Sequence, residues 1–134
     1  MPLLTEPVLF TGPDGRARFR DAPLLLPEGT PAARLSALMG TAGAQWRWSP
    51  AGFASDFHCT GTLQWLVVLG GRMEIGLRDG TARVFGPGEF FYSSDTLPAG
   101  QCFDPQVHGH RSRALDGMPL MTLFVRSAMP GARG

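Results

Sequence analysis

The chain has 134 residues, of which 43% are hydrophobic, and its formal net charge is +1. This length is enough for one domain with its own core, and the near-neutral charge gives none of the basic surface that nucleic-acid-binding proteins carry. With 18 glycines and 12 prolines, the composition favours many short elements joined by tight turns, which is typical of an all-β fold.

We expect no signal peptide at the start of this sequence. The first residues, MPLLTEPVLF, lack the charged start and long apolar stretch of a signal peptide. No apolar run approaches the ~20 residues that a membrane span needs. We therefore expect a cytoplasmic protein with no membrane partner, in which Cys59 and Cys102 are free thiols.

Residues 1–44 are expected to form an N-terminal arm that packs on a barrel of residues 45–126, with a frayed tail at 127–134. In the arm, residues 16–21 alternate like a short edge strand, and residues 32–39 have the composition for one or two helical turns. We expect no long helix anywhere in the chain.

The barrel region shows short apolar stretches separated by turn signals. Asp79-Gly80 is the strongest hairpin signal, and Gly70-Gly71 marks another tight turn. Regularly spaced strands of this kind indicate a sandwich or a barrel. The expected strands are 45–49, 57–60, 63–69, 72–78, 81–85, 89–93, 108–115 and 120–126.

A spacing pattern runs through the first half of this region. Gly52 is followed by five residues and His58, then by Thr60, then by three residues and Gln64, and after six more by Gly71. This resembles the first motif of the cupin superfamily, in which His-x-His and Glu stand at these positions. The resemblance implies a jelly-roll barrel, also called a double-stranded β-helix, with His58, Thr60 and Gln64 inside.

The second cupin motif is looser in this chain. Gly88 is followed by five residues and then by Ser94-Asp95-Thr96, where the family has Pro-x-Gly, and residues 97–107 form an insertion before His108-Gly109-His110. The segments GPGEFFYSSDT and GHRSR resemble those of a bacterial group of single-domain cupins, which carry Gln at the glutamate position of the first motif. The resemblance implies a fold rather than a reaction.

Cupin enzymes usually hold a divalent metal with three His and one Glu. His108 and His110 are two residues apart and share a face if the strand is regular, so we expect all three histidines to converge. The candidate metal ligands are His58, Gln64, His108 and His110, which suit Zn, Ni, Fe or Mn. In the alternative, His110 makes a hydrogen bond inside the barrel and His108 lies at the end of the loop.

Other residue types suit a small-molecule pocket that is apolar with a few polar groups. An arginine at position 47 or 111 is suited to an anionic group, although each can equally be exposed. The insertion at 97–107 is either a lid or a surface excursion. The further pocket candidates are Trp46, Trp48, Thr60, Met73, Tyr92, Cys102 and Arg111, each of which can instead be a core or surface residue.

Three functions remain open. The first is a metal-dependent dioxygenase, isomerase or lyase acting on a small organic acid or aromatic compound. The second is a metal-free cupin that binds or senses a small ligand, and the third is a non-catalytic structural module with a filled barrel. No phosphate-binding loop is present, so we expect no nucleotide cofactor. Edge strands need covering, and we expect a homodimer.

Overall fold

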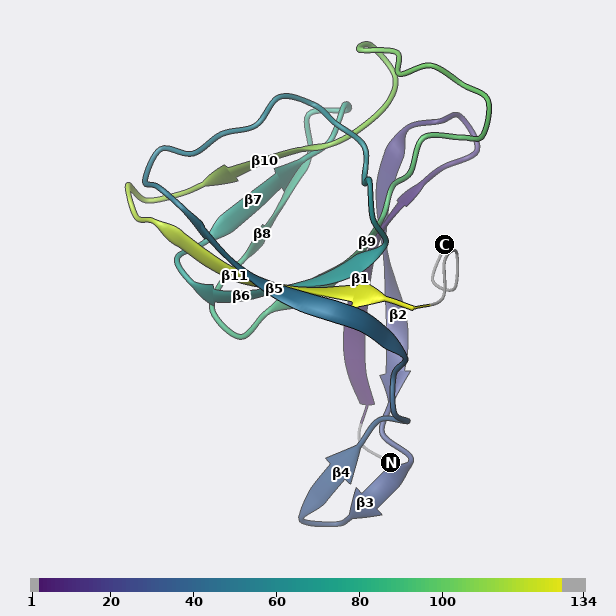
Figure 1. The fold of residues 1–134 in the computed structure, drawn as a ribbon, viewed down its shortest axis with the longest axis vertical. Helices are drawn as coiled ribbons and strands as arrows, with labels where there is room; N and C mark the ends of the chain where they lie inside the picture. The colour runs from purple at the N-terminus through teal and green to yellow at the C-terminus, as the bar shows by residue number, and fades with distance from the viewer. Residues whose placement is uncertain (1–2, 129–134) are drawn as a thin grey trace.

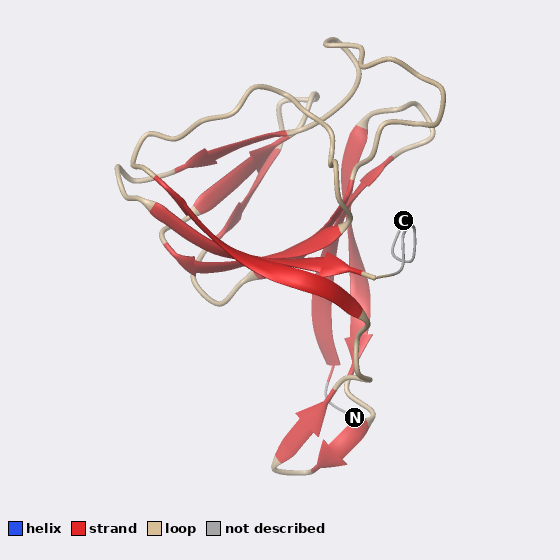
Figure 2. Cartoon of the chain, viewed as in Figure 1, coloured by secondary structure: helices blue, strands red, loops and turns tan. Residues whose placement is uncertain are grey.

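A computed structural model describes residues 3–128, and within that range every regular element is a strand (Figures 1 and 2). Because those residues contain no helix, they also contain none that is long and apolar enough to cross a membrane. The all-β class expected from the sequence is confirmed. The strands are β1 (Leu3–Thr11), β2 (Ala17–Leu25), β3 (Glu28–Thr30), β4 (Ala33–Leu35), β5 (Thr41–Ser49), β6 (Gln64–Gly70), β7 (Met73–Gly76), β8 (Ala82–Phe85), β9 (Phe90–Ser94), β10 (Arg111–Ala114) and β11 (Leu120–Ser127).

The strands form two facing sheets and one small hairpin. The larger sheet has the order β2-β1-β9-β6-β11-β5, and the smaller has the order β10-β7-β8. Isolated bridges from Ala54 to Arg113 and from His58 to His110 add the segment 54–58 to the free edge of β10. From β5 onward the chain crosses repeatedly between the sheets, which gives β5-β11-β6-β9 opposite 54–58, β10, β7 and β8. This nested order is that of a jelly roll.

The core lies between the two sheets and follows from strand alternation. In β6, the side chains of Leu66 and Val68 face inward. Trp65 has the opposite parity and belongs to a second hydrophobic cluster on the outer side of the sheet. Met73 and Ile75 of β7 face the same core from the opposite sheet. Alternate residues of each strand therefore fill the space between the sheets.

The tight turn between β6 and β7 requires a glycine. Gly71 has φ of 77°, and a Cβ built on it would lie 2.4 Å from the carbonyl oxygen of Pro119. A side chain here would meet backbone as well as left-handed strain. The turn expected at Gly70-Gly71 is therefore found, and it packs closely against the segment that leads into β11.

The N-terminal region contributes to the larger sheet. β1 pairs in parallel with β9 through Val8↔Tyr92, and β2 forms the sheet's edge beside β1. The edge strand expected at 16–21 is thus found in the longer β2, which begins one residue later, at Ala17. The hairpin β3–β4 extends away from the barrel (Figure 1).

The helical turns expected at 32–39 are wrong. Residues 33–35 form β4 instead, paired with β3 through Glu28↔Leu35. The Arg34 side chain donates two hydrogen bonds to the Leu26 carbonyl, at 3.2 and 2.8 Å. A helix of eight residues has little stability by itself, so pairing with the preceding segment prevails.

Candidate functional site

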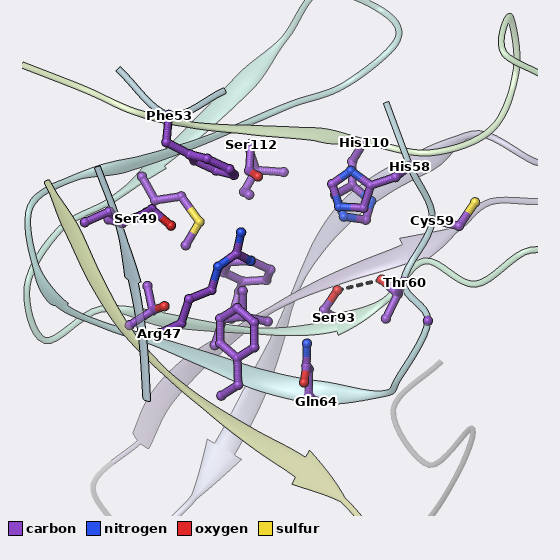
Figure 3. A pocket seen from close by; sticks show the side chains of 18 residues that line it. Arg47, Ser49, Phe53, His58, Cys59, Thr60, Gln64, Ser93, His110 and Ser112 are labelled. Carbon is purple, nitrogen blue, oxygen red and sulfur yellow. Dashed lines mark hydrogen bonds between the residues drawn. The ribbon is translucent and has the colours of Figure 1, made fainter. Parts of the chain in front are cut away.

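A cavity of about 180 Å³ lies between the two sheets (Figure 3). Its floor is apolar and its walls carry polar side chains, which is the usual character of a small-molecule pocket. The lining residues are Arg47, Ser49, Phe53, His58, Cys59, Thr60, Gly61, Gln64, Leu66, Met73, Ile75, Phe91, Ser93, His110, Ser112, Leu120, Thr122 and Phe124.

Two histidines stand side by side on the cavity wall. The backbones of His58 and His110 exchange two hydrogen bonds, of 2.9 and 3.0 Å between nitrogen and oxygen. Their ring centroids are 4.8 Å apart. His58 is exposed at the rim, whereas His110 is buried. The expected meeting of these two imidazoles in the barrel is therefore found.

Each of these rings has its Nδ1 atom engaged outside the cavity. Nδ1 of His58 lies 2.9 Å from the carbonyl oxygen of Asp56 and 3.4 Å from the Ser55 hydroxyl, and because the nearer partner is a carbonyl, which only accepts, this nitrogen is assigned the proton. Nδ1 of His110 lies 2.8 Å from Oδ2 of Asp95. When neutral, each ring consequently has an unprotonated Nε2.

Asp95 is a site residue that the sequence analysis missed. Its side chain is fully buried behind His110, and its other oxygen lies 2.8 Å from the Thr11 hydroxyl. Its backbone carbonyl accepts a hydrogen bond from the amide of Thr60, so it also anchors the loop that follows His58. The available signal was a lone carboxylate at the end of a buried apolar strand, a position that disfavours an unpaired charge.

Arg47 enters the cavity from β5, the edge strand of the larger sheet. Its guanidinium carbon lies 5.1 Å from the centroid of the Phe53 ring and 5.5 Å from that of Phe124. Figure 3 shows the side chain reaching into the middle of the pocket. Within residues 3–128 no carboxylate pairs with it, although the side chain remains accessible to solvent.

The remaining polar wall comes from two neighbouring segments. The Thr60 hydroxyl lies 2.6 Å from the Ser93 hydroxyl (dashed line in Figure 3), which ties the loop to β9. Gln64 begins β6 and its amide points into the cavity. Met73 contributes to the apolar floor from β7. Three candidates from the sequence, Thr60, Gln64 and Met73, therefore line this cavity.

His108 does not reach the cavity, which corrects the expected convergence of three histidines. Gly109, with φ of 91°, breaks the strand alternation between His108 and His110. The Nδ1 atom of His108 instead accepts a hydrogen bond from the Asp104 amide at 2.9 Å, and its carbonyl accepts two from Arg78. Residues two apart share a face only while the strand is regular.

The two tryptophans are on the same face of β5, as expected, but that face points outward. Arg47 and Ser49 hold the inward positions, and Trp46 and Trp48 are 73% and 63% exposed. The sequence predicted their shared face correctly and their place in the pocket wrongly, because alternation does not say which face meets the other sheet.

Three other candidates also lie outside the cavity. Tyr92 is fully buried on the outer side of β9, where its ring meets Trp65 at 4.9 Å between centroids. Cys102 is exposed in the 97–107 loop. The guanidinium of Arg111 lies over the Phe57 ring, 5.2 Å from its centroid. None of the three borders the space beside His58 and His110.

The donors around the cavity do not fit the divalent metal expected from the family resemblance. Two imidazoles and the Gln64 amide are available there, and the nearby carboxylate of Asp95 is already engaged behind His110. Among residues 3–128, no three His, Cys, Asp or Glu side chains are arranged so that they could hold a metal ion. Catalytic zinc sites generally use three such protein ligands, and a neutral amide does not offset the charge of the ion.

No protein-family model and no curated protein sequence matches the chain. Among solved structures it is similar to a Cupin 2 conserved barrel domain protein from Salinispora arenicola, with 19% identity and a TM-score of 0.43. That alignment covers 63% of this chain and 60% of the other protein. The strand order of the chain is that of a jelly roll, with a cavity between its two sheets.

Proposed function

We propose that this protein binds a small organic acid inside the barrel, with Arg47 holding the carboxylate and the two imidazoles facing the rest of the molecule. The observation that carries the proposal is the guanidinium in the cavity without a carboxylate partner among the described residues. A planar guanidinium with several donors matches a carboxylate in a two-pronged geometry.

The size of the cavity supports a small ligand. About 180 Å³ corresponds to roughly six water molecules. Drug-sized ligands occupy pockets of about 300 Å³ or more, so the space suits a metabolite of few non-hydrogen atoms. An unfilled space of this size also favours ligand binding over the alternative of a barrel filled by its own side chains.

The distribution of polar groups supports an acid with a second polar function. The guanidinium of Arg47 lies near the rings of Phe53 and Phe124, which gives it apolar neighbours. His58, His110 and Gln64 supply acceptors and a donor elsewhere on the wall. A ligand with a carboxylate at one end and a carbonyl or hydroxyl group beside it can bind Arg47 through the carboxylate and these other side chains through the second group.

A metal-dependent reaction is the second candidate, and the pairing of His58 with His110 is the observation in its favour. The two rings do not complete a usual ligand set, so the proposal involves no metal. The two candidates differ in what a chelator does. If our proposal is right, removal of metal leaves the binding of the carboxylate ligand unchanged. If a metal ion holds the ligand, removal of metal abolishes its binding.

The experiment compares acids with their uncharged amides. Acetate, pyruvate and benzoate are titrated against acetamide, pyruvamide and benzamide, by calorimetry and by the shift in melting temperature, with and without EDTA. At least one acid is expected to bind more tightly than its amide, with no effect of EDTA. A bound ligand at 100 times its Kd stabilises the fold by about 2.7 kcal/mol.

Matched variants identify the group responsible. Arg47→Met is expected to weaken binding of the acid by roughly tenfold or more. Arg83→Met is the control, because Arg83 pairs with Asp21 away from the cavity. Equal affinity for every acid and its amide, or wild-type affinity in Arg47→Met, contradicts the proposal.

A further inference from the structure

We propose that His110 is a general base, positioned by Asp95, that removes a proton from the carbon beside a carbonyl group of the bound acid. This inference rests on the proposed function, because it needs the acid in the cavity. It adds a reaction, a catalytic residue and a substrate class, namely small 2-oxo acids.

His110 and Asp95 form a buried pair. His110 and Asp95 are 5% and 0% exposed, and Nδ1 and Oδ2 are 2.8 Å apart. Thr11 lies at hydrogen-bond distance from the other carboxylate oxygen, at 2.8 Å. A buried carboxylate needs partners, and these contacts keep the imidazole in one orientation.

Nδ1 of His110 carries a proton and donates a hydrogen bond to the Asp95 carboxylate. The neutral ring therefore has its lone pair on Nε2, on the side away from Asp95. His110 borders the cavity, where the ring is not covered by the carboxylate. When Nε2 takes up a proton, the buried carboxylate stabilises the resulting imidazolium, as in other carboxylate–histidine pairs.

His110 differs from the neighbouring His58 in the group that its Nδ1 atom faces. His58 has the same pattern on its ring, but its Nδ1 faces a backbone carbonyl and the residue is exposed at the rim. A carbonyl orients the ring without supplying a negative charge. Only His110 therefore gains a buried counter-ion when it becomes protonated, so we assign the base to His110.

The chemistry balances without any added reagent. A C–H bond next to the ketone of a 2-oxo acid breaks, its proton goes to Nε2 of His110, and its electron pair moves onto the ketone oxygen to give an enolate. The Gln64 amide faces the cavity and is available to donate to this oxygen while Arg47 holds the carboxylate. The proton on Nε2 then exchanges with solvent, and return of a solvent-derived proton from Nε2 to the carbon regenerates the ketone, so that one hydrogen of the carbon has been exchanged.

The test follows hydrogen exchange in pyruvate, whose methyl group lies beside a ketone. The protein is incubated with pyruvate in D2O, and loss of the methyl proton signal is followed by NMR. Wild-type protein is expected to exchange deuterium into pyruvate faster than buffer alone. At saturating pyruvate, so that a change in affinity does not contribute, His110→Gln and Asp95→Asn are expected to slow this exchange by about 10² to 10⁴-fold.

Asp95 acts through His110, so its role must be tested by a measurement that distinguishes loss of the carboxylate from loss of the folded structure. Asp95→Glu restores a carboxylate and is expected to recover part of the exchange that Asp95→Asn loses. If Asp95→Asn does not fold, nitrogen-15 NMR of wild-type His110 still decides the point. Protonated Nδ1 with unprotonated Nε2 supports the inference, and the opposite tautomer overturns it.

The outcomes separate this inference from the proposed function. If pyruvate or another acid binds through Arg47 but wild-type exchange equals that of buffer, the base is absent and the binding function stands. Exchange at the wild-type rate in His110→Gln also overturns the inference. If no acid binds, both proposals fail, and the binding experiment shows it before exchange is measured.

Discussion

Gly109 lies against the backbone of His58. A Cβ built on Gly109 would be 2.7 Å from the His58 carbonyl oxygen, and its φ is 91°. This close approach allows the His58–His110 bridge to form and turns His108 away from the cavity. The glycine between the two late histidines thus decides which of them enters the site.

The first prediction concerns this contact. Gly109→Ala places a methyl group against backbone atoms and also forces a left-handed conformation, so we expect a loss of unfolding free energy of about 3 kcal/mol. Gly100→Ala is the control, because Gly100 has φ of 76° but nothing within 4 Å of its Cβ position. That variant should lose only about 1 kcal/mol. Equal losses in urea unfolding contradict the prediction.

The second prediction concerns pH and the turn before β11. Arg72 donates hydrogen bonds of 2.6 and 2.9 Å to the two oxygens of Asp116. These bonds lower the pKa of Asp116 below its ordinary value of 3.8. A lowered pKa means that the pair stabilises the fold above pH 3.8, and that this contribution disappears as the pH falls through the lower value in the folded protein.

Asp116→Asn tests this relationship, since asparagine also tolerates the φ of 63° at this position. The variant should melt below wild type at pH 7, and the difference should shrink as the pH falls below 3.8. Asp56→Asn, at an exposed aspartate whose carboxylate makes no ion pair with residues 3–128, is the control. A difference that is constant with pH would exclude the ion pair as its source.

The third prediction concerns the thiols, both of which are free, as expected. Burial and then the negative charge of Asp95 raise the pKa of Cys59, and Figure 3 shows its sulfur pointing away from the middle of the cavity. Cys102 is exposed. At pH 7 iodoacetamide should therefore modify Cys102 roughly tenfold faster than Cys59, because only the thiolate reacts.

Mass spectrometry of the alkylated peptides measures both rates. The rate at Cys59 should rise with pH, and Cys102→Ser should leave it unchanged. A Cys59 that reacts as fast as Cys102 would show that its thiol is neither buried nor affected by Asp95.

The fourth prediction is the homodimer expected from the sequence, which stays a prediction. β5 ends the larger sheet, and its outer face presents Trp46 and Trp48, with Met121 of β11 beside them. Exposed apolar side chains on an unpaired edge are suited to a second copy of the same surface. We expect two copies to pair over this face.

Light scattering checks the pairing. The double variant Trp46→Ser, Trp48→Ser should be a monomer at micromolar concentrations at which the wild-type protein is a dimer. Val84→Ser removes another exposed apolar side chain, which lies in β8 of the smaller sheet, and should leave the dimer intact. A wild-type protein that is monomeric at micromolar concentration contradicts the prediction.

Much of the fold could be predicted from local sequence. Leu63 to Leu69 was expected as the central strand, and the structure has β6 at Gln64–Gly70 between β9 and β11. Alternation of side chains and glycine turns are properties of neighbouring residues, so they are visible in the sequence. The spacing from Gly52 to Gly71 also placed His58 and Gln64 correctly on the wall of one cavity.

The sequence by itself determined the strands, the turns and which residues of a strand share a face. Only the tertiary structure decided which face looks inward, and therefore that Arg47 enters the cavity while Trp46 and Trp48 do not. It also brought Asp95 behind His110, a contact between residues that are distant in sequence. The physical reason is that strand pairing and the left-handed Gly109 bring together residues from different strands. Such contacts cannot be predicted from the pattern of neighbouring residues along the chain.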